Sequence, residues 1–173
     1  PEMAWYEMRT SAIIAKTLTE LGYDDVLTGK EVCLESARMG VPSEEELQAH
    51  AREAIAWGAP EEYLTDEMKE GYTGVIGILH CGEGPVVALR FDIDCLGMRE
   101  DATTEHRPYR EGFASEHLGW MHACGHDGHM TALLGLAYKL KDVQDLPHNV
   151  LLIFQPGEEV VNGAPSIINT GIF

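Results

Sequence analysis

The segment Val150-Leu-Leu-Ile-Phe154 is a run of apolar residues without a polar interruption. Such a run is typical of a strand that is buried on both faces of a sheet. It follows residues 126–141, in which apolar side chains recur every three or four positions, as they do along a helix. This alternation of helix and fully apolar strand favours an α/β sandwich with a mixed β-sheet.

Two further apolar segments, residues 75–79 and 86–89, flank the turn-like sequence Cys81-Gly-Glu-Gly-Pro85. Short apolar runs on either side of a turn rich in glycine and proline are typical of a β-hairpin. We therefore expect these two segments to pair directly with each other.

The N-terminal part of the chain is expected to be helical. Its first segment has apolar residues at helical spacing and ends at a glycine, a frequent residue just after a helix. Ser43 stands three residues before Glu46, which is the capping-box arrangement, and this predicts a helix over about 43–57. Pro60 is expected to start a shorter helix that runs to about residue 69.

The composition restricts the location and the partners of the protein. With 29 acidic and 12 basic residues, the formal net charge is −17. This charge disfavours nucleic acids and anionic membranes, because both bind cationic surfaces. No apolar run approaches the roughly 18 residues needed to cross a bilayer, and the four cysteines show no repeated short spacing. We expect one compact, soluble unit in the cytoplasm.

The stretch His122-Ala-Cys-Gly-His-Asp-Gly-His129 gathers three imidazoles, a thiol and a carboxylate. Divalent transition metals accept all of these ligand types. Cys124 and His126 are two positions apart and cannot share one face of a helix, so ligation by both requires a bent loop, which Gly125 permits. We predict that Cys124 and His126 bind a metal, and that the other two histidines support them or cap the helix.

Carboxylates follow two of the predicted strands, 86–91 and 150–154. Asp92 and Asp94 come directly after the strand 86–91 and can face one cleft, although such pairs also form turns and helix caps. Glu158 and Glu159 follow the apolar strand, and adjacent side chains diverge in any regular backbone. We therefore expect one to bind metal and the other to act as general base, taking a proton from water and returning it to the leaving amine.

A cysteine hydrolase is a second interpretation, with Cys124 as nucleophile and His126 as base. The short separation between the two gives poor attack geometry, and the glutamate pair would have no role. The sequence contains neither G-x-x-x-x-G-K-[ST] nor a G-x-G-x-x-G after a strand, so nucleotide chemistry has no support.

Taken together, these motifs make the chain resemble the zinc/manganese amidohydrolase and metallopeptidase family that includes aminoacylases, carboxypeptidase G, hippurate hydrolase and plant indole-acetyl-amino-acid hydrolases. The His-Ala-Cys-Gly-His-Asp motif is highly specific, and the segment that starts at His106 resembles the p-aminobenzoyl-glutamate branch. The matching stretches are Arg9-Thr-Ser11, Leu89-Arg-Phe-Asp-Ile-Asp-Cys-Leu96, His106-Arg-Pro-Tyr-Arg-Glu-Gly-Phe-Ala-Ser115, Met121-His-Ala-Cys-Gly-His-Asp-Gly-His129 and Phe154-Gln-Pro-Gly-Glu-Glu159.

The resemblance implies a three-layer sandwich of the zinc-peptidase type that binds two divalent ions, Mn or Zn. It implies that Cys124, His126 and Glu159 are metal ligands and that Glu158 is the general base. The implied reaction is hydrolysis of the amide bond in an N-acyl or N-aroyl amino acid, such as p-aminobenzoyl-glutamate. A homodimer or heteromer that forms through a lid domain is the implied assembly.

Relatives are longer and carry further histidine ligands and the lid domain beyond the matched region. We therefore expect residues 1–173 to be the N-terminal portion of a catalytic domain, without the lid, and to be inactive alone because the ligand set is incomplete. Two rival hypotheses remain open. One is a non-catalytic subunit that keeps the fold, and the other is a structural metal module with a closed four-ligand site.

Overall fold

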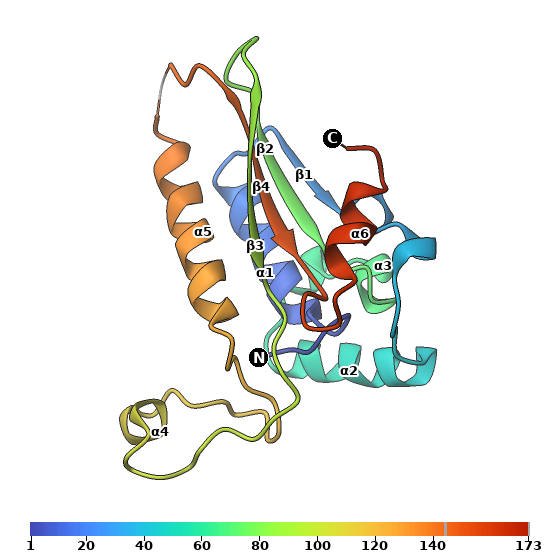
Figure 1. The fold of residues 1–173 in the computed structure, drawn as a ribbon, viewed down its shortest axis with the longest axis vertical. Coiled ribbons are helices and arrows are strands. Elements are labelled where there is room, and N and C mark those ends of the chain that lie inside the picture. The colour runs from blue at the N-terminus through green and yellow to red at the C-terminus, as the bar shows by residue number, and fades with distance from the viewer. Residues whose placement is uncertain (144, 173) are drawn as a thin grey trace.

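A computed structural model describes residues 1–143 and 145–172 as a four-stranded mixed sheet with helices on both faces (Figure 1). The strand order is β1-β2-β4-β3, in which β4 is antiparallel to β2 and parallel to β3. This confirms the predicted α/β fold with a mixed sheet. The helices are α1 (Met8–Glu20), α2 (Glu44–Ala56), α3 (Asp66–Lys69), α4 (Arg107–Glu111), α5 (His126–Leu140) and α6 (Gly163–Ile168), and the strands are β1 (Asp25–Thr28), β2 (Val75–Leu79), β3 (Val86–Asp92) and β4 (Asn149–Gln155).

The predicted hairpin is wrong, because β4 lies between β2 and β3. Six of the seven residues of β4 are buried, as expected for an apolar strand in the middle of a sheet that has helices on both faces. The first three residues of β3 are exposed, which suits an edge strand. The local turn between β2 and β3 remains, but their ladder partners lie on β4, where Val75 is opposite Phe154 and Val86 is opposite Asn149.

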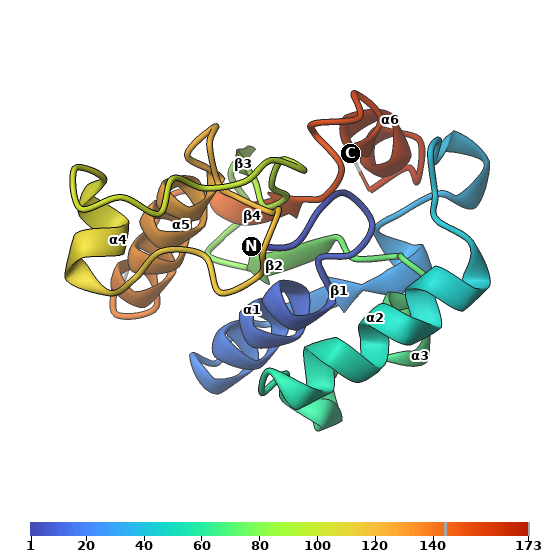
Figure 2. The same cartoon turned by 90° about the horizontal axis from the view of Figure 1, so that it is seen from below.

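Alternate side chains of the central strands build two separate cores. On one face, Leu152 and Phe154 pack with Leu18 of α1 and with apolar residues of α2 and α5. On the other face, Ile153 packs with Ile167 of α6. This division follows from the two-residue period of a strand. Figure 2 shows α1 and α6 on opposite sides of the sheet.

The predicted helices are largely confirmed. In α2, the Ser43 side chain accepts a hydrogen bond from the backbone of Glu46, and the Glu46 side chain accepts one from the backbone of Ser43. The expected helix after Pro60 is instead a 3₁₀ turn followed by α3, because the Thr65 hydroxyl caps a new helix start by accepting from the backbone N–H of Met68. The short elements β1 and α4 were not predicted.

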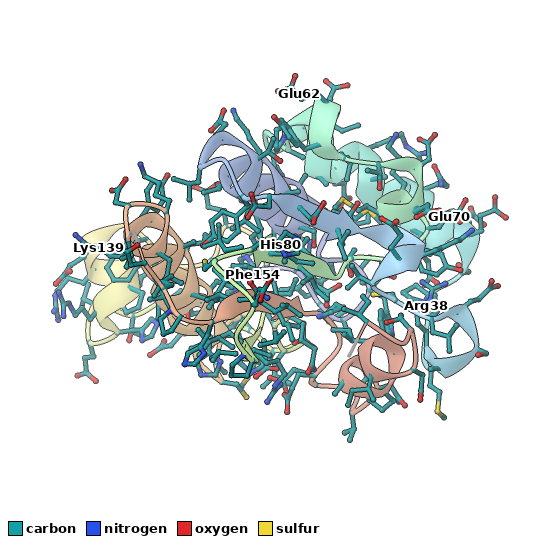
Figure 3. All side chains as sticks on the ribbon, turned by 90° about the horizontal axis from the view of Figure 1, so that it is seen from above. Arg38, Glu62, Glu70, His80, Lys139 and Phe154 are labelled. Atoms are coloured by element: carbon teal, nitrogen blue, oxygen red, sulfur yellow. The ribbon has the colours of Figure 1, made fainter. Side chains whose placement is uncertain are left out.

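The labelled side chains of Glu62, Glu70 and Lys139 lie at the periphery of the molecule, whereas Phe154 lies inside it (Figure 3). Arg38 attaches the segment before α2 to the rest of the protein. Its guanidinium carbon is 3.3 Å from the centroid of the Tyr72 ring, and Nη1 donates to the backbone oxygen of Glu70 over 3.1 Å.

Within the two described ranges, no helix has the combination of length and apolar character that a membrane span requires.

The substitution Ser43→Ala is expected to lower the free energy of unfolding by about 1 kcal/mol, because it removes the side-chain acceptor at the start of α2. Urea denaturation measures this change. Ser36→Ala is the control, since Ser36 is exposed in a short 3₁₀ turn and its loss is expected to change stability by less than about 0.5 kcal/mol. Equal effects of the two substitutions would show that the cap does not stabilise the protein.

Candidate metal centre

The candidate site lies where β3 and β4 end and α5 begins. Gly125 precedes the first residue of α5 with φ +80°, a left-handed conformation that glycine adopts without strain. The chain therefore turns sharply between Cys124 and His126, as the sequence predicts. His126 is buried in this turn, at the N-terminal end of the helix.

The backbone of Asp94 fixes the orientation of the His126 ring. The Nδ1 atom of His126 is 2.8 Å from the backbone oxygen of Asp94 and 3.4 Å from its Oδ1 atom. An imidazole that donates from Nδ1 to a carbonyl oxygen leaves Nε2 free as a ligand atom. That Nε2 atom is 3.8 Å from Oε2 of Glu158, so the free nitrogen faces the glutamate pair.

Both glutamates reach His126. One oxygen of Glu158, one oxygen of Glu159 and one ring nitrogen of His126 all lie within 4.8 Å of one another. The expected divergence of the two side chains is therefore not seen. The reason is that they lie in a turn rather than in regular backbone. In this turn the backbone N–H of Val161 donates to the backbone oxygen of Glu158 over 2.8 Å. Val161 has φ +60°, a strained conformation for a β-branched residue.

Cys124 lies at the exposed rim of the site. A hydrogen bond to Glu159 is the main reason why the pKa of its thiol is raised, and the charges of Glu158 and Asp94 add to the effect. The thiol is therefore beside Glu159, although it is not among the ligand atoms that lie within 4.8 Å of one another around His126.

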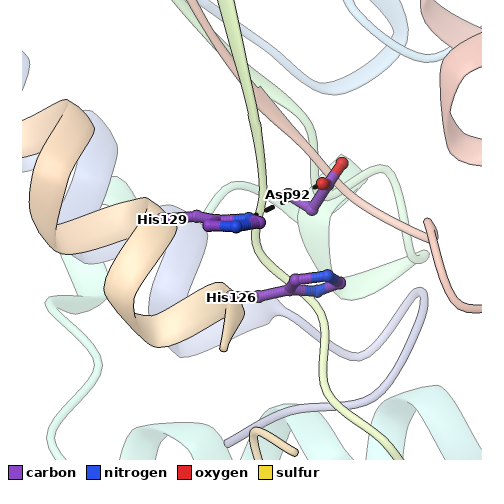
Figure 4. A group of neighbouring side chains, drawn as sticks. All are labelled: Asp92, His126 and His129. Carbon is purple, nitrogen blue, oxygen red and sulfur yellow. Dashed lines mark ion pairs between the residues drawn. The ribbon is translucent and has the colours of Figure 1, made fainter. Parts of the chain in front are cut away.

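A second group of possible ligands consists of Asp92, His126 and His129 (Figure 4). His129 Nδ1 is 3.7 Å from Asp92 Oδ2, and the two imidazole rings are 5.2 Å apart at an interplanar angle of 26°. The guanidinium of Arg90 donates to Asp92 and, over 2.9 Å, to Gln155. Sequence reasoning gave His129 only a supporting role, although its separation of three from His126 predicts a shared helix face.

Several polar atoms of the site are buried without a hydrogen-bond partner in the described part of the chain, namely Asp94 Oδ1, Glu159 Oε1 and His129 Nδ1. Each such atom costs about 1–3 kcal/mol in desolvation. Together with Cys124 and His126, these residues supply carboxylates, imidazoles and a thiol. A divalent cation among His126, Glu158 and Glu159 would satisfy the Glu159 oxygen and offset negative charge, so this donor set fits a metal.

Two buried carboxyl groups hold the turn that carries the glutamate pair. Asp94 Oδ2 accepts from the backbone N–H of Glu159 over 2.9 Å. Glu7 Oε1 accepts from the backbone N–H of Gly157 over 2.9 Å. Burial raises the pKa of Glu7 well above its usual range, and the charge of Asp94 raises it further. Nothing in the sequence indicates that Glu7 reaches this turn, because the two are distant along the chain.

A cavity of about 870 Å³ borders the site through His122 and Asp127. Trp57 and Phe113 are among its apolar walls, and Phe113 belongs to the segment that follows α4. Burial lowers the pKa of His122 to about 4, so this imidazole is neutral at physiological pH. The cavity therefore offers a volume with both apolar and polar walls next to the candidate ligands.

The substitution Glu7→Gln is expected to remove part of the pH dependence of stability. Because the folded state raises the pKa of Glu7 above its ordinary value of 4.5, the native protein binds more protons than the unfolded chain. The stability of the wild type therefore falls as the pH rises above that value. Urea denaturation should show a gain for the variant at about pH 8 that is absent at about pH 4. The same difference at both pH values would contradict the raised pKa.

The comparison with known sequences gives matches over nearly the whole chain. Residues 88–173 match the model of peptidase family M20/M25/M40. One subunit of the p-aminobenzoyl-glutamate hydrolase of Escherichia coli (strain K12) and the indole-3-acetyl-aspartic acid hydrolase of Enterobacter agglomerans are each 44% identical to the chain over 173 residues. Each match covers 99% of this chain and 39% of the relative, so the chain spans about two fifths of their length.

Solved structures give the same result. The aminobenzoyl-glutamate utilization protein from Klebsiella pneumoniae matches with a TM-score of 0.74 and 32% identity, over 99% of this chain and 37% of that one. The YXEP protein of Bacillus subtilis, described as a dinuclear metal binding peptidase, matches with a TM-score of 0.65 and 30% identity, over 99% of this chain and 35% of that one. On these grounds, the chain belongs to peptidase family M20/M25/M40.

Proposed function

We propose that residues 1–173 are the N-terminal portion of the catalytic domain of a cytoplasmic, metal-dependent hydrolase. It cleaves the amide bond of an N-acyl or N-aroyl amino acid. The observation that carries this proposal is the convergence of His126, Glu158 and Glu159 within 4.8 Å, at a point where buried oxygens have no partner among the described residues. Two similar proteins are named for p-aminobenzoyl-glutamate and indole-3-acetyl-aspartic acid, and each of these compounds joins an aromatic acyl group to an acidic amino acid.

Cys124, His126 and Glu159 would hold the metal, and we infer two ions, either manganese or zinc. A bound cation supplies Lewis acidity that polarises the amide carbonyl. The family resemblance and the dinuclear neighbour support the pair of ions. The orientation of His126 supports its own role, because its Nδ1 atom is occupied by the backbone of Asp94 and its Nε2 atom is free.

Glu158 is the general base in this proposal. It takes a proton from the attacking water and delivers it to the leaving amine. Its Oε2 atom is 3.8 Å from His126 Nε2, close enough to the candidate ligands to reach a water molecule held among them. The adjacent Glu159 is tied down by Asp94 through its backbone, which suits a fixed ligand beside a proton carrier.

The cavity beside His122 and Asp127 gives a place for the aromatic acyl group, since Trp57 and Phe113 can pack against a ring. A homodimer or heteromer is our proposal for the assembly, and it is supported by the relative from Escherichia coli, whose name describes one subunit of a hydrolase. A non-catalytic subunit is the alternative, but such a protein would have no need to retain these ligand types together.

The substitution Glu158→Gln tests the catalytic role. It should lower kcat by about 10²-fold or more while metal content stays the same, because it removes the proton acceptor and keeps the shape of the side chain. Hydrolysis of p-aminobenzoyl-glutamate and indole-3-acetyl-aspartate by the full-length protein is the measurement. Glu105→Gln, at an exposed position, is the control. Undiminished kcat in Glu158→Gln would show that another group is the base.

The substitution Cys124→Ala tests the ligand assignment. The variant of the full-length protein should lose at least about tenfold in affinity for Zn²⁺ or Mn²⁺, because a ligand is lost outright. Titration of the metal-free protein with each ion measures the affinity. Cys81→Ala is the control, since Cys81 is a free thiol that lies just after β2. Equal affinities in the two variants would exclude Cys124 as a ligand.

A further inference from the structure

The turn between β4 and α6 that carries Glu158 and Glu159 rests on the first residues of the chain. Trp5 and Glu7 precede α1, and both are fully buried. They lie under Gly157, the residue just before the glutamate pair. The direction of both glutamate side chains therefore depends on a contact between the two ends of the described chain.

The Glu7 carboxyl group has two hydrogen bonds, each from a different segment. Oε1 accepts from the backbone N–H of Gly157 over 2.9 Å, and Oε2 accepts from the hydroxyl of Thr73 over 2.5 Å. Thr73 is itself fixed, because its backbone oxygen accepts from the hydroxyl of Ser11 over 2.5 Å. Helix α1 and the segment that leads into β2 thus hold the carboxyl group in one place.

The Gly157 peptide is confined from the other directions as well. Its φ is +61°, and a Cβ atom at this position would lie 3.1 Å from the ring of Trp5. Its carbonyl oxygen accepts from the backbone N–H groups of Asn162, over 3.3 Å, and of Gly163, over 3.0 Å. Its N–H donates to Glu7 and its carbonyl accepts from the next turn, so both peptide units that flank Gly157 have little freedom to rotate.

A carboxyl group is a costly choice for the interior of a protein. Burying it without charge compensation opposes folding, and an apolar side chain in the core would avoid this cost. What Glu7 supplies is an acceptor for the Gly157 N–H, which would otherwise be buried without a partner. The position of this acceptor decides where the turn begins.

We propose that Glu7 is a positioning residue, which sets the place of the Gly157 peptide and thereby directs Glu158 and Glu159 toward His126. Asp94 performs the matching task two residues later, at the backbone N–H of Glu159. The effect on metal binding and catalysis rests on the proposed function of the site, whereas the effect on the turn does not. Glu7 is not proposed to touch the metal or the substrate.

The test compares Glu7→Met with the wild type in the full-length protein. Methionine fills a similar volume but offers no acceptor to Gly157. In the metal-free protein, amide hydrogen exchange over residues 156–162 should become about tenfold faster or more, because the closing hydrogen bond is lost. Zn²⁺ affinity should fall by about 10–100-fold, the range found for groups that orient ligands. The value of kcat should fall by more than KM rises.

Three further variants separate positioning from general stability. Glu7→Gln keeps an oxygen for Gly157 and an NH₂ group for Thr73, so it should restore slow exchange and most of the metal affinity. Leu18→Val removes buried apolar volume about three turns further along α1, and should lower the melting temperature without faster exchange at 156–162. If Glu7→Met does not fold, Thr73→Val replaces it, with changes in the same direction.

The outcomes are distinct. Unchanged exchange at residues 156–162 in Glu7→Met, or in Thr73→Val if it is needed, overturns the inference. An exchange increase that Leu18→Val reproduces also overturns it, because the effect would then be one of stability alone. A wild type that binds no Zn²⁺ and hydrolyses no N-acyl amino acid defeats the proposed function, while the exchange data still decide the role of Glu7 in the turn.

Discussion

The parallel pairing of β3 with β4 is the constraint on which the candidate site depends. It sets Asp92 opposite Gln155, so that the segments leaving both strands emerge at the same edge of the sheet. Asp94 and Glu159 then come within hydrogen-bond distance although they are far apart in sequence. Helix α5 connects the two parallel strands, as such a topology requires, and its first turn brings His126 to that edge. One pairing therefore assembles the groups from three segments.

The sequence predicts those features that depend on neighbouring residues. The capping box of Ser43, the bend at Gly125 and the buried character of β4 all follow from local patterns. The false hairpin shows the limit of this reasoning. The turn after β2 is present, but the strand that pairs with both β2 and β3 comes much later in the chain. Glu7 escapes prediction for the same reason, since only the folded chain shows its partner.

The candidate site contains several features that destabilise the folded state, and the rest of the fold must offset them. Glu7 and Asp94 are buried acids in one neighbourhood, and each is disfavoured in its charged form by burial. Val161 adds a strained backbone just after the glutamate pair. Such features persist only where surrounding structure over-determines them. Here the two apolar cores on either side of β4 supply that structure.

Strand β3 has a neighbour on one side only among the described residues, and Val86 and Val87 are exposed on it. The backbone donors and acceptors on its other side form a ready template for strand addition from another chain. The large negative charge opposes self-association by repulsion, and salt weakens that repulsion. The tendency of residues 1–173 to associate with one another, when they are handled in isolation, thus depends on ionic strength as much as on folding.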